Sequence, residues 1–265
     1  GNVTHEGRGT MTNVDSPVRR FKVVGTTPAR HDGVDKVTGR ARYGADIQLP
    51  GLLHGKVLRS PYPHAKIIQI DASRAMSLMG VQAVITGKDT AGMKVGRMVR
   101  DVPLLAEDKV RFVGEKVAAV AANDLDTAEE ALALIDVEYE PLPAVFDPLE
   151  AMEPGAPLVH EGSPAFESGS GLVQPQGNIL NHATWANGEL EQGFQESDLI
   201  FEHTFATTWV HQGYMEPYAC VVGIDDAGRI QVWANNKVPY TLRRQLAEAL
   251  AISEDRILVN PCGIG

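Results

Sequence analysis

The chain has 265 residues, of which 43% are hydrophobic and 22% are charged, which is enough apolar material for one large domain or two ordinary ones. Its formal net charge of -10 disfavours nucleic acid as a partner, because a negative surface repels the phosphate backbone. No apolar run approaches the roughly 18–20 residues that cross a bilayer, so the sequence predicts no membrane span.

The two cysteines, Cys220 and Cys262, stand far apart and have no metal-ligand spacing. We therefore predict neither a disulfide framework nor a metal site built by this chain alone. Residues 1–20 are polar and lack the apolar core of a signal peptide, so we interpret them as a disordered or artificial lead-in. These features together predict a cytoplasmic protein.

The first region that we expect to fold, residues 21–148, mixes strands with helices. An Ala- and Leu-rich run predicts a helix over 126–135, opened by Asp124. Two β-like runs within 109–122, split by Gly114 and Glu115, favour a hairpin. Further strands are predicted over 39–46, 52–59, 66–71, 81–86 and 137–139. Without a regular βαβ repeat, this pattern predicts an α+β fold.

A Pro-, Gly- and Ser-rich stretch, residues 149–177, is predicted to be an extended linker. A second organised region covers 178–265, and the turn Asp225-Asp226-Ala227-Gly228 predicts a hairpin within it. The elements expected in this region are helices over 189–196 and 241–251 and strands over 178–185, 199–208, 219–224, 229–234 and 256–259.

Few residues carry a recognisable chemistry of their own, since phosphate-loop, dinucleotide, zinc-protease and nucleophile-elbow motifs are all absent from the sequence. Glu216 lies in an otherwise apolar stretch. It is either an acid/base group with a raised pKa or a structural residue that caps a helix or pairs with an arginine, and the pattern favours the structural role. Gly263 and Gly265 form either a plain turn or a place where backbone N–H groups approach an anionic ligand.

Longer motifs resemble one family, the xanthine dehydrogenase/aldehyde oxidase family, over residues 20–265. Four of them occur in the order typical of its α/β hammerhead domain: KVTGRARYGAD (36–46), RSPYPHA (59–65), VRFVGEKVAAV (110–120) and VEYEPLPAV (137–145). HQGYMEPYACVV (211–222) and the run 232–265 resemble the start of its molybdopterin-binding domain. The resemblance implies a hammerhead domain at 21–148 and an incomplete first segment of the cofactor-binding domain at 178–265.

The resemblance also implies an activity and a set of site residues. Family members hydroxylate an aldehyde or an N-heterocycle with water, and their general-base Glu and most molybdopterin contacts are expected outside this chain. No catalytic site is therefore expected to be complete in it. The residues implied to face the molybdenum–molybdopterin cofactor are Asn236, Lys237, Gly263, Ile264 and Gly265, and the substrate-channel candidates are Tyr214, Met215 and Glu216.

One implied position departs from the family pattern. The family places a Gln there, which hydrogen-bonds an oxygen on molybdenum, whereas the matching residue in this chain is Lys237. A lysine brings a positive charge where glutamine brings a neutral amide. Asn236 can substitute for that Gln if the match shifts by one residue, and the sequence leaves both alternatives open.

The expected partners follow from what the chain lacks. The remainder of the molybdopterin subunit, an iron–sulfur subunit and an FAD subunit would complete the enzyme, and the chain alone is expected to be inactive. The alternative is a non-catalytic assembly module that has kept the hammerhead fold.

Overall fold

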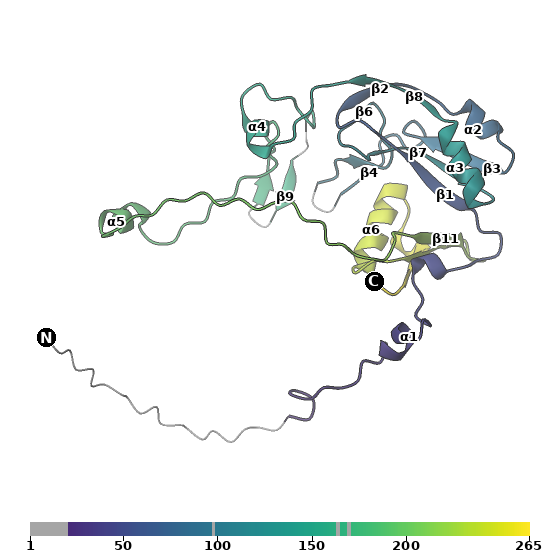
Figure 1. Ribbon diagram of the computed structural model, residues 1–265, viewed down its shortest axis with the longest axis horizontal. Helices are drawn as coiled ribbons and strands as arrows, with labels where there is room; N and C mark the ends of the chain where they lie inside the picture. Colours follow the sequence, from purple (N-terminus) through teal and green to yellow (C-terminus); the bar gives the residue numbers. More distant parts are fainter. Residues whose placement is uncertain (1–20, 97–98, 163–164, 169–170) are drawn as a thin grey trace. The chain divides into compact units, whose positions relative to one another are not determined.

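The computed structural model describes residues 21–96, 99–162, 165–168 and 171–265, and the predicted lead-in at 1–20 lies outside this part of the chain (Figure 1). By its internal contacts the chain divides into two units, residues 1–41 and 42–265. In the described part of the first unit, helix α1 (Gly33–Val37) follows Asp32, whose carboxylate pairs with Arg30 at 3.0 Å and Lys36 at 2.9 Å. These ion pairs are exposed and therefore contribute little stability.

The second unit begins with an antiparallel sheet in the order β1–β7–β3, formed by β1 (His54–Arg59), β7 (Lys116–Ala122) and β3 (Val81–Thr86). The predicted strands 52–59 and 81–86 are thereby confirmed. The central strand β7 is the most apolar of the three and is the most deeply buried. Helix α3 (Leu125–Ala133) follows it, and the carboxylate of Asp124 caps this helix by accepting a hydrogen bond from Thr127 N at 2.8 Å.

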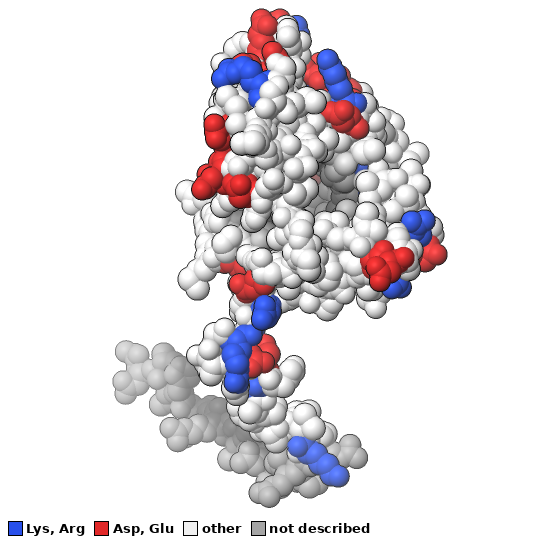
Figure 2. Space-filling model, turned by 90° about the vertical axis from the view of Figure 1, so that its right-hand side faces the viewer, with Lys and Arg blue, Asp and Glu red and all other residues white. Residues whose placement is uncertain are grey.

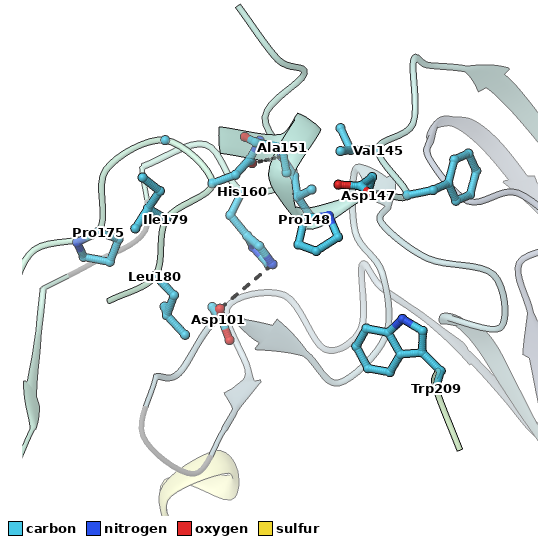
Figure 3. A pocket seen from close by; sticks show the side chains of 14 residues that line it. Asp101, Val145, Asp147, Pro148, Ala151, His160, Pro175, Ile179, Leu180 and Trp209 are labelled. Atoms are coloured by element: carbon cyan, nitrogen blue, oxygen red, sulfur yellow. Dashed lines mark hydrogen bonds and ion pairs between the residues drawn. The ribbon is translucent and has the colours of Figure 1, made fainter. Parts of the chain in front are cut away.

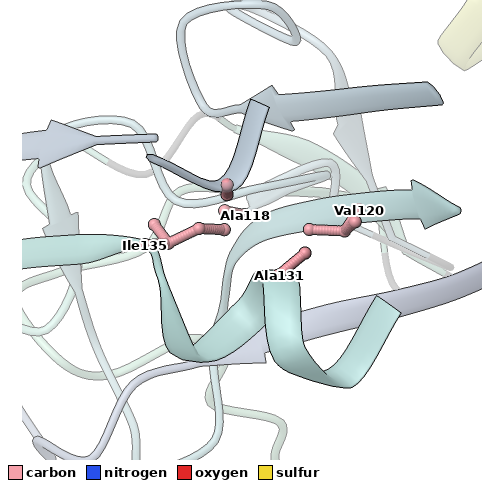
Figure 4. Packing of buried hydrophobic residues seen from close by; sticks show 5 residues of the cluster. Ala118, Val120, Ala131 and Ile135 are labelled. Carbon is pink, nitrogen blue, oxygen red and sulfur yellow. The ribbon is translucent and has the colours of Figure 1, made fainter. Parts of the chain in front are cut away.

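The core of this sheet lies between α3, the short helix α2 (Ser73–Ser77) and the strands. Figure 4 shows Ala131 and Ile135 pointing from the helical side toward Ala118 and Val120 of β7. Three of the five buried residues in this cluster are alanines, so the helix packs close to the sheet with small side chains on both surfaces.

A second sheet, in the order β6–β2–β8, consists of β6 (Lys109–Val110), β2 (Ala65–Asp71) and β8 (Asp136–Pro141). The predicted hairpin over 109–122 is therefore wrong, because β6 pairs with β2 whereas β7 pairs with β1. The chain passes between the two sheets in the connection from β1 to β2 and again in the connection from β6 to β7, and these two connections lie beside each other. Gly114 N donates to Ser60 O and Ser60 N donates to Glu115 O, both at 2.8 Å. Gly114, with φ +89°, makes the bend possible.

The range predicted as an extended linker contains regular elements. Helix α4 (Pro148–Met152) starts at Asp147, whose carboxylate accepts hydrogen bonds from Leu149 N and Glu150 N. Strands β9 (Phe166–Ser168) and β10 (Gly171–Val173) pair with each other. A further two-residue pair joins β4 (Lys94–Val95) to β5 (Val102–Pro103).

A third sheet, in the order β11–β12–β13, is formed by the last strands along the chain. The predicted hairpin is confirmed, with β11 (Cys220–Ile224) and β12 (Ile230–Ala234) antiparallel. Helix α6 (Pro239–Leu250) and the 3-10 turn Glu254–Arg256 then lead to β13 (Ile257–Pro261), which pairs with β12 in parallel. The helix packs on the sheet through a core of Val232, Ala247 and Ile257.

Two predicted strands do not form. Neither 178–185 nor 199–208 is a strand, although the helix expected between them is present as α5 (Leu190–Gln195). Both segments have the composition of strands, but no described residue pairs with them beyond one isolated bridge between Gln176 and Ile179. Among the described residues, no helix combines the length and apolarity that a membrane crossing requires.

Candidate functional site

The three groups of residues predicted to form a site leave the third sheet at the same end. Because β12 and β13 run parallel, with Ala234 opposite Pro261, the segments that follow both strands emerge together. The antiparallel strand β11 starts at Cys220, opposite Ala234, so the residues before it approach that end too. The sheet therefore brings 214–216, 236–237 and 263–265 to the end at which β12 and β13 terminate. In open sheets with parallel strands, ligands commonly bind at the carboxyl ends of the strands.

The glycine-containing segment 263–265 packs against a turn that the sequence did not assign to the site. Gly263 N donates to Arg42 O at 3.2 Å, and a Cβ on Gly263 would lie 3.0 Å from the ring of Tyr43. The neighbouring Gly44 is equally constrained, since a Cβ there would lie 2.8 Å from Ala219 O. Glycine permits this close approach of backbones, which larger residues would prevent.

This turn corrects one sequence prediction. Residues 39–46 were expected to form a strand, but Gly44–Asp46 form a 3-10 turn in which Asp46 Oδ2 accepts a hydrogen bond from Tyr43 N at 2.9 Å. The Gly44 position within KVTGRARYGAD was the only signal in the sequence that a close contact occurs here.

Glu216 contacts the glycine segment directly. Its Oε2 accepts a hydrogen bond from Gly265 N at 2.6 Å, and a Cβ on Gly265 would lie 2.9 Å from Glu216 Cβ. The carboxylate is half-buried and serves as a structural acceptor for a backbone N–H, a role different from the helix cap or arginine pair considered from the sequence. Gly265 N thus already binds a negatively charged oxygen, as an anion-binding amide would.

Cys262 lies beside this contact. Burial raises the pKa of its thiol, and the negative charge of Glu216 raises it further. The group is therefore a protonated thiol at neutral pH, and its Sγ lies 3.9 Å from Asn260 O. Among the described residues, no group of three or more His, Cys, Asp or Glu side chains is placed so that it could hold a metal ion.

Asn236 and Lys237 lie in the loop between β12 and α6. Asn236 Oδ1 accepts a hydrogen bond from Val238 N at 2.6 Å, so its acceptor oxygen shapes the entry into α6. Lys237 is exposed. The structure thus gives Asn236 a local structural task and leaves the Lys237 side chain accessible to a ligand or a partner.

The substrate-channel candidates divide into two kinds. The ring of Tyr214 packs 5.1 Å from His211 and 5.0 Å from Tyr218, and hydrogen bonding with Tyr218, followed by desolvation, raises the pKa of Tyr214. Met215 instead is 94% exposed. The aromatic group therefore forms a defined surface beside Glu216, while Met215 contacts little of the described chain.

A cavity of about 430 Å³ is lined by residues from 145–160 and 175–180 together with Asp101 and Trp209, and by none of the groups described so far (Figure 3). His160 Nε2 and Asp101 Oδ2 face each other there at 3.9 Å, and burial lowers the pKa of His160 although Asp101 opposes the shift. Asn178 holds one wall together, because its amide donates to Ala151 O and Pro157 O at 3.0 and 2.9 Å. Sequence reasoning had not singled out these residues.

Figure 2 shows one face on which acidic and basic side chains stand in small mixed groups with uncharged surface between them. Exposed pairs such as Lys66–Glu140 at 2.8 Å and Arg74–Asp136 at 3.3 Å show how charges of opposite sign neighbour each other.

Two family models define the class of protein, a molybdopterin-binding chain that contains a hammerhead domain. Residues 38–143 match the sequence model "Aldehyde oxidase and xanthine dehydrogenase, a/b hammerhead domain", and residues 173–265 match "Molybdopterin cofactor-binding domain". The chain belongs to the xanthine dehydrogenase/aldehyde oxidase family and corresponds to the N-terminal part of its molybdopterin-binding large subunits.

Individual relatives agree with this assignment. The chain is 41% identical over 237 residues to a probable xanthine dehydrogenase subunit of Bacillus subtilis (strain 168), covering 88% of this chain and 30% of the relative. It is 31% identical to the nicotinate dehydrogenase large molybdopterin subunit of Eubacterium barkeri, covering 90% of this chain and 53% of the relative. The chain thus spans about a third to a half of these two relatives.

A solved structure shows the same fold. Quinoline 2-oxidoreductase from Pseudomonas putida 86 superposes with a TM-score of 0.80 at 33% identity, covering 93% of this chain and 31% of that one. The prediction of an α+β hammerhead domain followed by the beginning of a molybdopterin-binding domain is therefore confirmed.

Proposed function

We propose that this chain forms one wall of the molybdenum–molybdopterin site of a multi-subunit hydroxylase and that the rest of the large subunit completes the site. The observation that carries the proposal is the convergence of 214–216, 236–237 and 263–265 at one end of the third sheet. These segments come from three separate stretches of sequence, and a plain structural turn at 263–265 would not require the other two.

The residues at this end of the third sheet fit an anionic cofactor. The segment 263–265 approaches its neighbours so closely that a Cβ at Gly263 or Gly265 would collide with them, and Gly265 N already donates to a carboxylate oxygen. The exposed ammonium of Lys237 adds the positive charge that balances an anion. When bound, the cofactor would supply the redox chemistry of hydroxylation.

The chain's own residues would orient the cofactor and cover the entry to its site. Ile264 N, which lies between Gly263 N bound to Arg42 O and Gly265 N bound to Glu216, would donate a hydrogen bond to an oxygen atom of the cofactor, and Gly265 N could do so in place of its bond to Glu216. The rings of Tyr214 and Tyr218 would cover one side of the entry with an apolar surface. Neither task is a proton transfer, which agrees with the expectation that the general base lies outside this chain.

The substrate class that we favour is an N-heterocycle. Relatives and solved structures that resemble the chain include proteins named for xanthine, nicotinate and quinoline, as well as for carbon monoxide and aldehydes. The relative that is 41% identical is named for xanthine, which is a nitrogen heterocycle. Iron–sulfur and FAD groups in partner subunits would receive the electrons, because the two cysteines of this chain are too few to ligate a cluster.

The test is metal and pterin analysis of the chain assembled with the rest of its large subunit. We expect close to one molybdenum and one pterin per assembled subunit, measured by inductively coupled plasma mass spectrometry and by fluorescence of the oxidised pterin. Gly263→Val should lower both contents, whereas Gly193→Val, at a position on α5 where a Cβ would meet nothing within 4 Å, should not. A stable assembly without molybdenum and pterin would instead support a non-catalytic module.

A further inference from the structure

The turn at residues 42–46 packs on the backbone of two of the three segments that meet at the end of the third sheet. Gly44 is buried, and a Cβ there would lie 2.8 Å from Ala219 O and 3.8 Å from Asn235 N. Ala219 immediately precedes β11, and Asn235 immediately follows β12. The turn therefore contacts the stretch that leads from the channel candidates into β11 and the stretch that leads from β12 to Lys237.

The third segment, 263–265, lies against the same turn. Gly263 N donates to Arg42 O at 3.2 Å, and a Cβ on Gly263 would lie 3.0 Å from the ring of Tyr43. Tyr43 is half-buried, and its own backbone N–H donates to Asp46 Oδ2 at 2.9 Å, which closes the turn. The Tyr43 ring thus limits how far the glycine segment can move toward the turn.

These contacts fix the direction of one backbone amide. Gly263 N is bound to Arg42 O, and Gly265 N is bound to Glu216 Oε2 at 2.6 Å. Ile264 N lies between these two bound amides and has no hydrogen-bond partner among the described residues. The turn on one side and Glu216 on the other therefore set the direction in which the Ile264 N–H points.

The turn belongs by sequence to the other matched domain. It lies within residues 38–143, which match the hammerhead domain, whereas the residues that it contacts all lie within 173–265. Leu49 continues along the same sheet, because a Cβ on Gly223 of β11 would lie 3.3 Å from Leu49 Cδ1. The chain thus packs along the third sheet before it enters β1.

We propose that the turn 42–46 positions the three segments of the cofactor site and that Tyr43 is a positioning residue, acting through Gly263. The proposal rests on the proposed function. Without the ring, the glycine segment gains room on the side of the turn, and the Ile264 N–H loses its fixed direction. Residues that orient a binding group from behind typically change the affinity of a metal site by about 10–100-fold when they are replaced.

The core of the third sheet does not depend on this ring. Its buried residues are Val232, Ala247 and Ile257, and no residue of the turn belongs to the described cluster around them. Removing the Tyr43 ring should therefore leave the third sheet folded, so that an effect on the cofactor can be separated from an effect on folding.

The test uses the chain assembled with the rest of its large subunit. Tyr43→Ala should lose molybdenum about tenfold faster than the wild type during dialysis, because Ile264 N is no longer held in place. Tyr43→Phe keeps the ring and should retain molybdenum like the wild type. The matched control is Tyr62→Ala, which removes a ring that packs 5.1 Å from Tyr139 of β8 and should leave molybdenum retention unchanged.

Hydrogen–deuterium exchange gives a second readout that does not require the cofactor. The amides of 262–265 should exchange faster in Tyr43→Ala than in the wild type, because the bond from Gly263 N to Arg42 O opens more often. The amides of β12 should keep their rate, since the core of the third sheet is intact. Tyr43→Phe should restore slow exchange at 262–265.

The outcomes separate this inference from the proposed function. If the wild-type assembly contains molybdenum and pterin, the inference requires both faster metal loss and faster exchange in Tyr43→Ala, and either one alone overturns it while the proposed function stands. If the wild-type assembly contains neither, the proposed function fails, and the exchange rates alone decide whether Tyr43 positions the segment. Equal losses in Tyr43→Phe or Tyr62→Ala, or faster exchange throughout β12, would show a general effect on folding and overturn the inference.

Discussion

Among single residues, Cys262 offers a direct measure of the charge on Glu216. Burial is the larger cause of the raised pKa of this thiol, and the carboxylate of Glu216 adds to it because a nearby negative charge disfavours the thiolate. Glu216→Gln removes the charge and keeps an oxygen that can accept the Gly265 N–H. We expect the pKa of Cys262 to fall but to remain above that of a free cysteine.

The measurement is the rate of alkylation by iodoacetamide against pH in a Cys220→Ser background, which leaves one thiol in the chain. The rate profile should move to lower pH in the Glu216→Gln variant, since more thiolate is then present at each pH. Glu191→Gln, on α5, is the control and should leave the profile in place. An unchanged profile for Glu216→Gln would show that the two groups do not interact in solution.

Gly44 tests how tightly the turn beside the glycine segment is packed. A Cβ there would lie 2.8 Å from Ala219 O, a backbone atom that cannot rotate away. We expect Gly44→Ala to lower the free energy of unfolding by about 1–3 kcal/mol, as overpacking does, in urea titrations. In the matched variant Gly55→Ala, on β1, the nearest atom to the new Cβ lies at 3.9 Å, so its loss should be much smaller. Equal losses would count against the close approach.

At the level of elements, helix α3 illustrates how a core of alanines limits side-chain size. Ala131 is fully buried against β7, whereas Ala133 of the same helix is exposed. Ala131→Leu should therefore cost about 1–3 kcal/mol of unfolding free energy, while Ala133→Leu should be nearly neutral. Urea denaturation followed by circular dichroism measures both, and similar values for the two variants would show that α3 is not packed as described.

The elements also show which parts of the fold the sequence could predict. The hairpin β11–β12 and helix α6 were predictable because a turn motif and a 3.6-residue periodicity are local signals. The hairpin over 109–122 was predicted wrongly because the partners of β6 and β7 lie far earlier in the chain, in β2 and β1. Local pattern contains no information about such pairing.

The features of the site also divide into those with a signal in the sequence and those set by pairing between distant segments. The resemblance pointed to the glycine segment and the loop at 236–237, but their convergence depends on the parallel register of β12 with β13. The contact of Glu216 with Gly265 joins residues 49 positions apart, and the support from Tyr43 and Gly44 comes from a segment expected to be a strand. Tertiary pairing, which no short motif encodes, fixed these contacts.

For the whole molecule, two opposing forces decide how the free chain behaves in solution. A net charge of -10 makes copies repel each other, while the exposed aromatic side chains Trp185, Phe205 and Trp209 attract. The charge repulsion is screened by salt, since the Debye length falls from about 10 Å at 0.1 M to about 3 Å at 1 M, whereas apolar attraction is not. Self-association of the free chain should therefore increase with salt.

Sedimentation velocity of the free chain in low and high sodium chloride measures this balance, and binding of a hydrophobic dye reports the exposed apolar surface. We expect larger species and undiminished dye fluorescence at high salt. Association that instead weakens as salt is added would mean that charged surfaces hold the copies together. The exposed aromatic side chains would then not form the main self-associating surface of the molecule.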